Sequence, residues 1–127
     1  MKAVMDTSVV VSGDAPSLGD DDLFVAAVTF AELHAAVLTA SNDADRARRL
    51  RRLTTLAALY DPLPFDAGVA IAYGRISTEV AQQRGPRRTG PMDLLIAATA
   101  LANGCRLYTR KVVEFEGLEA VLEVIRV

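Results

Sequence analysis

The sequence has a single cysteine, no long apolar run and little net charge. One cysteine excludes a disulfide within the chain and fits a reducing cytoplasm. The longest apolar run, residues 94–102, is far too short to span a bilayer. The formal net charge is −2, so the chain as a whole does not attract nucleic acid through positive charge. If the protein binds nucleic acid, its positive charge must be local.

Length and the N-terminal pattern indicate one mature domain. The 127 residues are enough for a sizeable core, so residues 1–127 are predicted to form a single unit. Residues 1–11 combine a lysine with an apolar run, but Asp6 interrupts that run and no small-residue cleavage site is evident. This pattern predicts a first strand rather than a secretory signal peptide.

The most informative stretch is PMDLLIAATALANGCRLYT, residues 91–109. Pro91 suits the first position of a helix, where an N–H would be unpaired in any case. The helix body is apolar almost all round, which predicts burial on most sides. Asn103 and Gly104 end the helix, because glycine readily adopts the left-handed conformation at a helix C-terminus. Asp93 is therefore a lone carboxylate in the first turn of a buried helix.

Strands and helices are predicted to alternate along the chain. Four segments have the composition of strands: residues 3–5, 23–28, 105–108 and 121–127. The prolines in residues 61–64 allow only an edge strand there. Helices are predicted at 29–41, from 43 or 45 onward, from 66 onward and at 91–102. Thr7 and Ser8 are expected to cap a very short helix that ends near residue 13. This order predicts an α/β fold with a mainly parallel central sheet flanked by helices.

Four acids far apart in sequence are expected at one edge of this sheet. Asp6 ends the first strand, and Glu32 is predicted in the first turn of the helix that leaves the second strand. Asp93 lies in the first turn of the helix that leads into the third strand, and Glu114 lies in the loop after that strand. In parallel crossovers these positions meet at the carboxyl edge of the sheet, where open α/β folds place their sites.

Clustered carboxylates repel one another unless a cation neutralises them. Ligands that are all oxygen suit Mg²⁺ or Mn²⁺. Such an ion can activate water and stabilise charge on a phosphoryl group. Phosphodiester hydrolysis is therefore the reaction that these acids indicate.

Each acid also has a purely structural interpretation. Thr29 and Glu32 have the spacing of a capping box, in which Glu32 would bond only to a backbone N–H. A carboxylate such as Asp93 is favoured near any helix N-terminus. Asp6 can be a turn or cap residue, and Glu114 lies in a charged loop where exposure is the usual state. It is their joint placement at one edge that favours a site.

Four segments, in order, carry a family resemblance: MDTSVVV at 5–11, VTFAEL at 28–33, MDLLIAATALANG at 92–104 and LYTRKVVEFEGL at 107–118. Together they resemble PIN-domain ribonucleases, specifically the VapC-type toxins of bacterial toxin–antitoxin pairs. The resemblance implies a single PIN-like domain and a metal-dependent endoribonuclease that uses Mg²⁺ or Mn²⁺. It also implies a homodimer, a cognate VapB-type antitoxin and a structured RNA substrate, with tRNA and rRNA as the candidate classes.

The resemblance assigns roles residue by residue. The family's acids match Asp6, Glu32 and Asp93, which would hold the metal, and Glu114 as the fourth catalytic acid. Thr109 matches a threonine whose hydroxyl orients a carboxylate, and Ser8 matches a small polar residue beside the first acid. Lys111 departs from the family, which usually has asparagine there, and Glu114 replaces the usual aspartate. The span from Asp6 to Glu32 is also shorter than usual, which implies a truncated first helix and altered dimer and antitoxin surfaces.

Two groups of cations provide local positive charge. Arg110 and Lys111 beside the acids, and Arg87 and Arg88 in a predicted loop, are candidate contacts to RNA phosphates. A second group, for which a solvated helix face is the commoner explanation, consists of Arg46, Arg48, Arg49, Arg51 and Arg52. An antitoxin would insert an apolar helix or strand into a groove, for which the exposed part of residues 30–38 is the candidate.

Two other classes of protein remain as alternatives. A non-catalytic PIN-like module would bind RNA or a partner without cleavage, and it could carry the same acids. A receiver-type phosphoacceptor domain has a similar length and also uses acids and Mg²⁺ at this edge. That domain needs an acidic pair beside the first strand, whereas Asp6 stands alone there.

Overall fold

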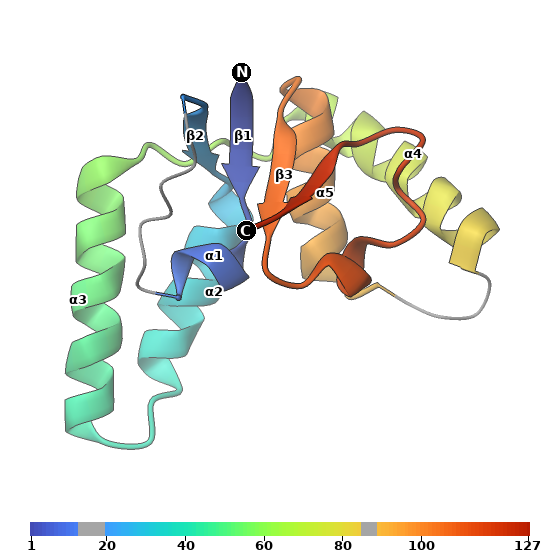
Figure 1. The fold of residues 1–127 in the computed structure, drawn as a ribbon. Helices are drawn as coiled ribbons and strands as arrows, with labels where there is room; N and C mark the ends of the chain where they lie inside the picture. The colour runs from blue at the N-terminus through green and yellow to red at the C-terminus, as the bar shows by residue number, and fades with distance from the viewer. Residues whose placement is uncertain (13–19, 85–88) are drawn as a thin grey trace.

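Four parallel strands form the centre of the structure, a computed structural model that describes residues 1–12, 20–84 and 89–127 (Figure 1). The strands are β1 (Lys2–Met5), β2 (Asp22–Val25), β3 (Arg106–Thr109) and β4 (Val124–Arg126). The helices are α1 (Thr7–Val10), α2 (Ala27–Leu38), α3 (Asp43–Leu59), α4 (Ala67–Arg84) and α5 (Pro91–Ala102), and a 3₁₀ turn, η1, spans Val112–Phe115. The sheet order is β2-β1-β3-β4 and every neighbouring pair is parallel, which confirms the predicted fold class.

Each face of the sheet has its own hydrophobic core, because successive strand residues point to opposite sides. Val4 and Leu107 pack against α4 and α5. Met5 and Tyr108 belong to the other core, which includes residues of α2 and α3. Figure 1 shows α4 and α5 on one side of the strands and the α2–α3 pair on the other. The central strands β1 and β3 are therefore covered on both faces.

Helix α5 is the most deeply buried helix segment, as its sequence predicts. Residues 96–100 are all buried, and α5 packs along α4. Its end is a Schellman motif, in which Cys105 N–H donates to the carbonyl of Ala100 (2.9 Å) and Gly104 N–H donates to that of Leu101 (3.2 Å). Gly104 has a φ of +65°, which is the left-handed conformation that this motif requires.

The first two helices begin earlier than predicted. Asp6, rather than Thr7 or Ser8, is the N-cap of α1, and its Oδ1 accepts a hydrogen bond from the N–H of Val9 (3.1 Å). Helix α2 begins at Ala27 and has no side-chain cap. The predicted start at Thr29 is wrong, because backbone pairing at Ala26 ends the extended segment directly before Ala27.

Strand β2 is correspondingly shorter than residues 23–28, and residues 61–64 do not form an edge strand. Leu63 makes only a single parallel bridge to Ala26. Its N–H donates to Val25 O (2.9 Å) and its carbonyl accepts from Ala27 N (2.8 Å). Prolines on both sides of Leu63 prevent the ladder from continuing. The last strand is also shorter than the predicted 121–127, since residues 118–122 form a turn closed by Leu118.

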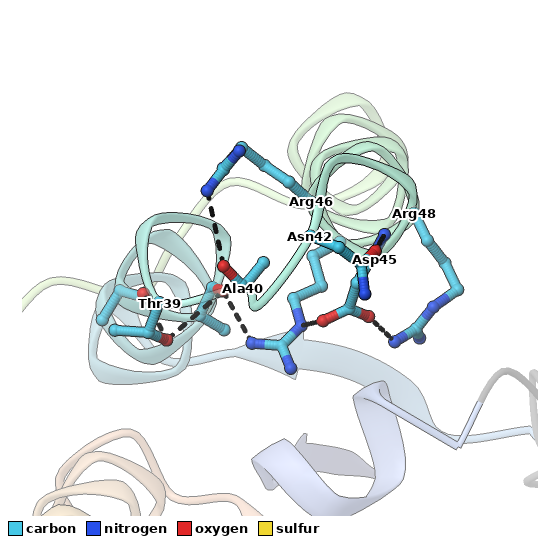
Figure 2. Close-up of polar contacts among 9 residues, drawn as sticks. Thr39, Ala40, Asn42, Asp45, Arg46 and Arg48 are labelled. Atoms are coloured by element: carbon cyan, nitrogen blue, oxygen red, sulfur yellow. Dashed lines mark hydrogen bonds and ion pairs between the residues drawn. The ribbon is translucent and has the colours of Figure 1, made fainter.

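Arginines of α3 close the turn between α2 and α3 (Figure 2). Arg49 donates to the carbonyl of Ala36 (2.7 Å) and pairs with Asp45 (3.0 Å). Arg46 reaches the carbonyl of Ala40 (3.4 Å), and Arg48 also pairs with Asp45. The contacts to Ala36 and Ala40 satisfy one carbonyl in the last turn of α2 and one in the turn that follows it. Three of the five arginines in this group are therefore held within the protein.

None of the helices in residues 1–12, 20–84 and 89–127 combines the length and apolar character that a membrane crossing requires.

The two glycines Gly104 and Gly74 allow a paired test of this fold. We expect Gly104→Ala to lower the free energy of unfolding by about 1 kcal/mol, because alanine is strained at positive φ. A methyl group added at either glycine would meet no atom within 4 Å, so crowding does not contribute. Gly74→Ala, in the middle of α4, should instead raise the free energy of unfolding by up to about 1 kcal/mol. Urea unfolding measures both, and equal effects of the two variants would contradict the assignment of the C-terminal motif.

Candidate active site

A cavity of about 540 Å³ lies at the carboxyl edge of β1. It is lined by residues from α1, α2, the start of α5 and the segment after β3: Asp6, Thr7, Ser8, Val11, Glu32, Gly90, Pro91, Met92, Asp93, Arg110 and Lys111. Three of the four predicted acids therefore line one cavity. Glu114 is absent from this lining but lies in η1, close enough to affect Asp93 electrostatically.

Asp6 is the most firmly held of these acids. Its side chain is only 2% exposed, and both carboxylate oxygens accept hydrogen bonds. Oδ1 accepts from Ser8 Oγ (2.6 Å) and from the N–H of Val9 (3.1 Å), and Oδ2 accepts from Thr109 Oγ1 (2.6 Å). Charge-assisted bonds of this kind are strong and fix the position of a buried carboxylate.

The two predicted supporting residues, Thr109 and Ser8, are both placed beside Asp6. Thr109 is fully buried, and its Oγ1 accepts from the backbone N–H of Lys111 (2.9 Å) while it donates to Asp6. Ser8 Oγ accepts from the backbone N–H of Arg110 (3.0 Å). The strand that ends at Thr109 is thus joined to the acid that follows β1, and the backbone of both cations is anchored there.

Glu32 lies in the second turn of α2, not in the first as predicted, because α2 begins at Ala27. The capping-box interpretation is wrong for the same reason. Glu32 Oε1 instead accepts a hydrogen bond from Thr7 Oγ1 (2.7 Å), across the boundary between α1 and α2. Thr29, the other half of the supposed box, is fully buried and its Oγ1 lies 3.1 Å from that of Thr7.

Thr7 is the site residue that sequence reasoning missed. It lines the cavity and makes the only side-chain hydrogen bond to Glu32 found among the described residues. A signal was present, since Thr7 is a hydroxyl residue directly after Asp6. The sequence does not show which acid its hydroxyl meets, because that partner is 25 residues away.

Asp93 lies in the first turn of α5, close to Gly90, the N-cap of that helix. A methyl group at Gly90 would come within 3.8 Å of Asp93 Oδ2. Burial, with the added repulsion of the carboxylates of Asp6, Glu114 and Glu32, raises the pKa of Asp93 to about 6. The ammonium group of Lys111 acts in the opposite direction and lowers this pKa. All four predicted acids therefore share one electrostatic environment.

The donors of this site are oxygen atoms, which fit a hard cation such as Mg²⁺ or Mn²⁺. Within the described residues, no group of three or more histidine, cysteine, aspartate or glutamate side chains is arranged to hold one ion. Mg²⁺ keeps several of its water molecules and needs direct ligands from only one or two carboxylates. The donor set therefore fits such an ion, without a complete protein cage.

Of the predicted RNA contacts, Arg110 and Lys111 line the cavity. Arg87 and Arg88 lie outside the described residues. His34 is exposed on α2, and Cys105 is buried, where desolvation raises the pKa of its thiol.

The fold and the site define an α/β domain whose parallel sheet carries an acidic cavity at its carboxyl edge. The PIN domain family matches residues 3–110, and the chain belongs to this family. It is 27% identical over 133 residues to Ribonuclease VapC1 of Rickettsia felis, and the match covers 100% of this chain and 97% of that protein.

Solved structures give the same result. The crystal structure of VapBC-5, a member of the VapBC family of toxin–antitoxin systems from Mycobacterium tuberculosis, matches with a TM-score of 0.82 and 31% identity. That match covers 99% of this chain and 98% of the other. DNA-bound VapBC from Salmonella typhimurium shares the fold, with a TM-score of 0.81 at 22% identity over 99% and 98% of the two chains. The family resemblance seen in the sequence is confirmed.

The raised pKa of Asp93, caused by burial and by repulsion from the other carboxylates, gives a stability prediction in the absence of divalent ions. The folded-state pKa is above the unfolded one, so the folded protein binds more protons between about pH 4 and pH 6. Stability from this group is therefore lost as the pH rises through that range. In chelator at pH 7.5 we expect Asp93→Asn to raise the free energy of unfolding by about 1 kcal/mol, a value discounted because the group is partly exposed. The Tm should rise by about 3 °C.

The matched control for this prediction is Asp61→Asn, which changes an exposed aspartate away from the cavity. It should leave the Tm within about 1 °C of the unmodified protein. The gain at Asp93 should also disappear below pH 4. A gain of equal size at pH 4 and pH 7.5 would show that the negative charge of Asp93 is not its cause.

Proposed function

We propose that this protein is a Mg²⁺- or Mn²⁺-dependent endoribonuclease that acts as the toxin of a type II toxin–antitoxin system. The observation that carries the proposal is the convergence of Asp6, Glu32 and Asp93 on one cavity, with repulsion at Asp93 that a cation would relieve. The full-length likeness to Ribonuclease VapC1 and to VapBC-5 supports RNA as the substrate.

In this proposal Asp6, Glu32 and Asp93 hold the ion, some of them through its water molecules, and Glu114 in η1 adds negative charge that acts on Asp93. A bound divalent ion supplies an activated water molecule and neutralises charge on the phosphoryl group. Ser8, Val9 N–H and Thr109 keep Asp6 in place before the ion arrives. Arg110 and Lys111 lie at the same cavity, where their cationic side chains can pair with phosphates on either side of the cleaved bond.

The partners follow from the same relatives. A VapB-type antitoxin would bind this chain and block the cavity, with a basic side chain that meets the acids. We expect a homodimer in the bacterial cytoplasm, where cleavage of a structured RNA of the tRNA or rRNA class would inhibit translation and growth. The candidate antitoxin surface in residues 30–38 is partly available, since Phe30 and Leu33 are buried while Leu38 is 80% exposed.

The proposal predicts metal-dependent cleavage that needs Asp6. Purified protein, free of antitoxin, should cut total cellular RNA into a few discrete fragments with Mg²⁺ or Mn²⁺, and chelator should abolish this. Asp6→Asn should lower the rate at least about 100-fold, because the carboxylate is lost from the ion site. The fold should survive, since asparagine is as good an N-cap as aspartate.

Asp61→Asn is again the control and should cleave at the normal rate. Cleavage by the Asp6→Asn protein at the unmodified rate, or cleavage that persists in chelator, would refute the proposed mechanism. Folded, metal-loaded protein that cuts no RNA would favour the non-catalytic PIN-like module instead.

The cations at the cavity give a separate prediction about RNA binding. The inactive Asp6→Asn protein allows binding of the RNA identified in the cleavage assay to be measured at several salt concentrations. Adding Lys111→Gln should lower the slope of log affinity against log salt by about one, because one phosphate contact is lost. Arg51→Gln, on the exposed face of α3, should leave the slope unchanged. If the two variants change the slope equally, Lys111 has no special role in RNA binding.

A further inference from the structure

Three side chains form a hydrogen-bonded chain between α1 and α2. Thr7 Oγ1 donates to Glu32 Oε1 at 2.7 Å, and it lies 3.1 Å from Thr29 Oγ1. A hydroxyl group has one proton, and that of Thr7 is given to the carboxylate. Thr29 must therefore be the donor to Thr7. The direction of the chain is fixed, from buried Thr29 through Thr7 to Glu32.

The acids of the cavity differ in how firmly they are held. Asp6 has donors on both oxygens, so its position does not depend on any single contact. The hydrogen bond found for Glu32 within the described residues is at Oε1, which leaves Oε2 available to a cation. Glutamate also has a longer side chain than aspartate, with more rotamer freedom to lose. The hydroxyl group of Thr7 is thus the hydrogen-bond donor that the described residues offer to order Glu32.

We propose that Thr7 is a positioning residue that orders Glu32 for cation binding. This inference rests on the proposed function, since Glu32 is taken there as a ligand. Thr7 holds Oε1, so that the carboxylate occupies one orientation at the cavity wall before a cation enters. Without this hydrogen bond, ordering of Glu32 would have to accompany binding, and the affinity for the cation would fall.

Thr7 is well placed for this role because it begins the helix that Asp6 caps. Residue 6 thus supplies one acid and residue 7 orders a second, which comes from a different element. Thr29 is fully buried, and its hydroxyl donates to Thr7 Oγ1. This hydrogen bond fixes the rotamer of Thr7. Two adjacent residues at the start of α1 therefore help to organise the cavity.

The test is titration of RNA-free protein with Mn²⁺, followed by calorimetry. Thr7→Val keeps the shape of the side chain and removes the hydroxyl, and we expect it to weaken Mn²⁺ binding about tenfold. Thr7→Ser retains the hydroxyl and should recover most of the affinity. Thr78→Val, the same substitution on the exposed surface of α4, should bind Mn²⁺ normally. Circular dichroism checks that each variant is folded.

The effect must act through Glu32. In a Glu32→Gln background, Thr7→Val should cause little further loss, because the carboxylate that it orders is gone. In cleavage assays the Thr7→Val protein should recover its kcat at saturating Mn²⁺, which a general loss of structure would not allow. Normal Mn²⁺ affinity in Thr7→Val, or an equal loss in both backgrounds, would overturn the proposal for Thr7. Absence of Mn²⁺ binding by the unmodified protein would instead remove the proposed function on which it rests.

Discussion

The buried carboxylate of Asp6 joins three parts of the structure that are distant in sequence. It caps α1, follows β1 and accepts a hydrogen bond from Thr109 at the end of β3, 103 residues away. A buried charge is costly unless it is hydrogen-bonded, so Ser8, the N–H of Val9 and Thr109 stabilise the fold as well as the site. The arrangement of the cavity depends on this one satisfied group.

The neighbouring acid Asp93, in contrast, destabilises the folded state when it is charged. Asp93 lies where burial and three other carboxylates all disfavour its charge, and only Lys111 among the causes of its pKa shift favours it. The surrounding structure holds Asp93 in this position, although few interactions there stabilise its negative charge. The neutral parts of the molecule provide the compensating stability. These include the two cores on either face of the sheet and the closely packed α4–α5 pair.

Much of this structure could be predicted from the sequence, because the strongest signals are local or topological. Pro91, the apolar body of α5 and Gly104 set the bounds of that helix, and strand–helix alternation sets the parallel sheet. The convergence of Asp6 and Asp93 follows from the same topology. The predictions that failed concern features set by contacts between residues distant in sequence. Backbone pairing of Leu63 with residues 25–27 moved the start of α2, and with it the turn that carries Glu32.

The sheet order has a consequence for the timing of synthesis. Strand β1 lies between β2 and β3, so the first strand made must wait for the next to last before both of its edges are paired. Thr109 donates a hydrogen bond to Asp6, and the carboxylate of Asp6 repels that of Asp93. Both Thr109 and Asp93 belong to the final third of the sequence. Contacts this far apart in sequence form late. A chain still being translated therefore lacks a complete acidic cavity until the segment from Asp93 to Thr109 has emerged from the ribosome.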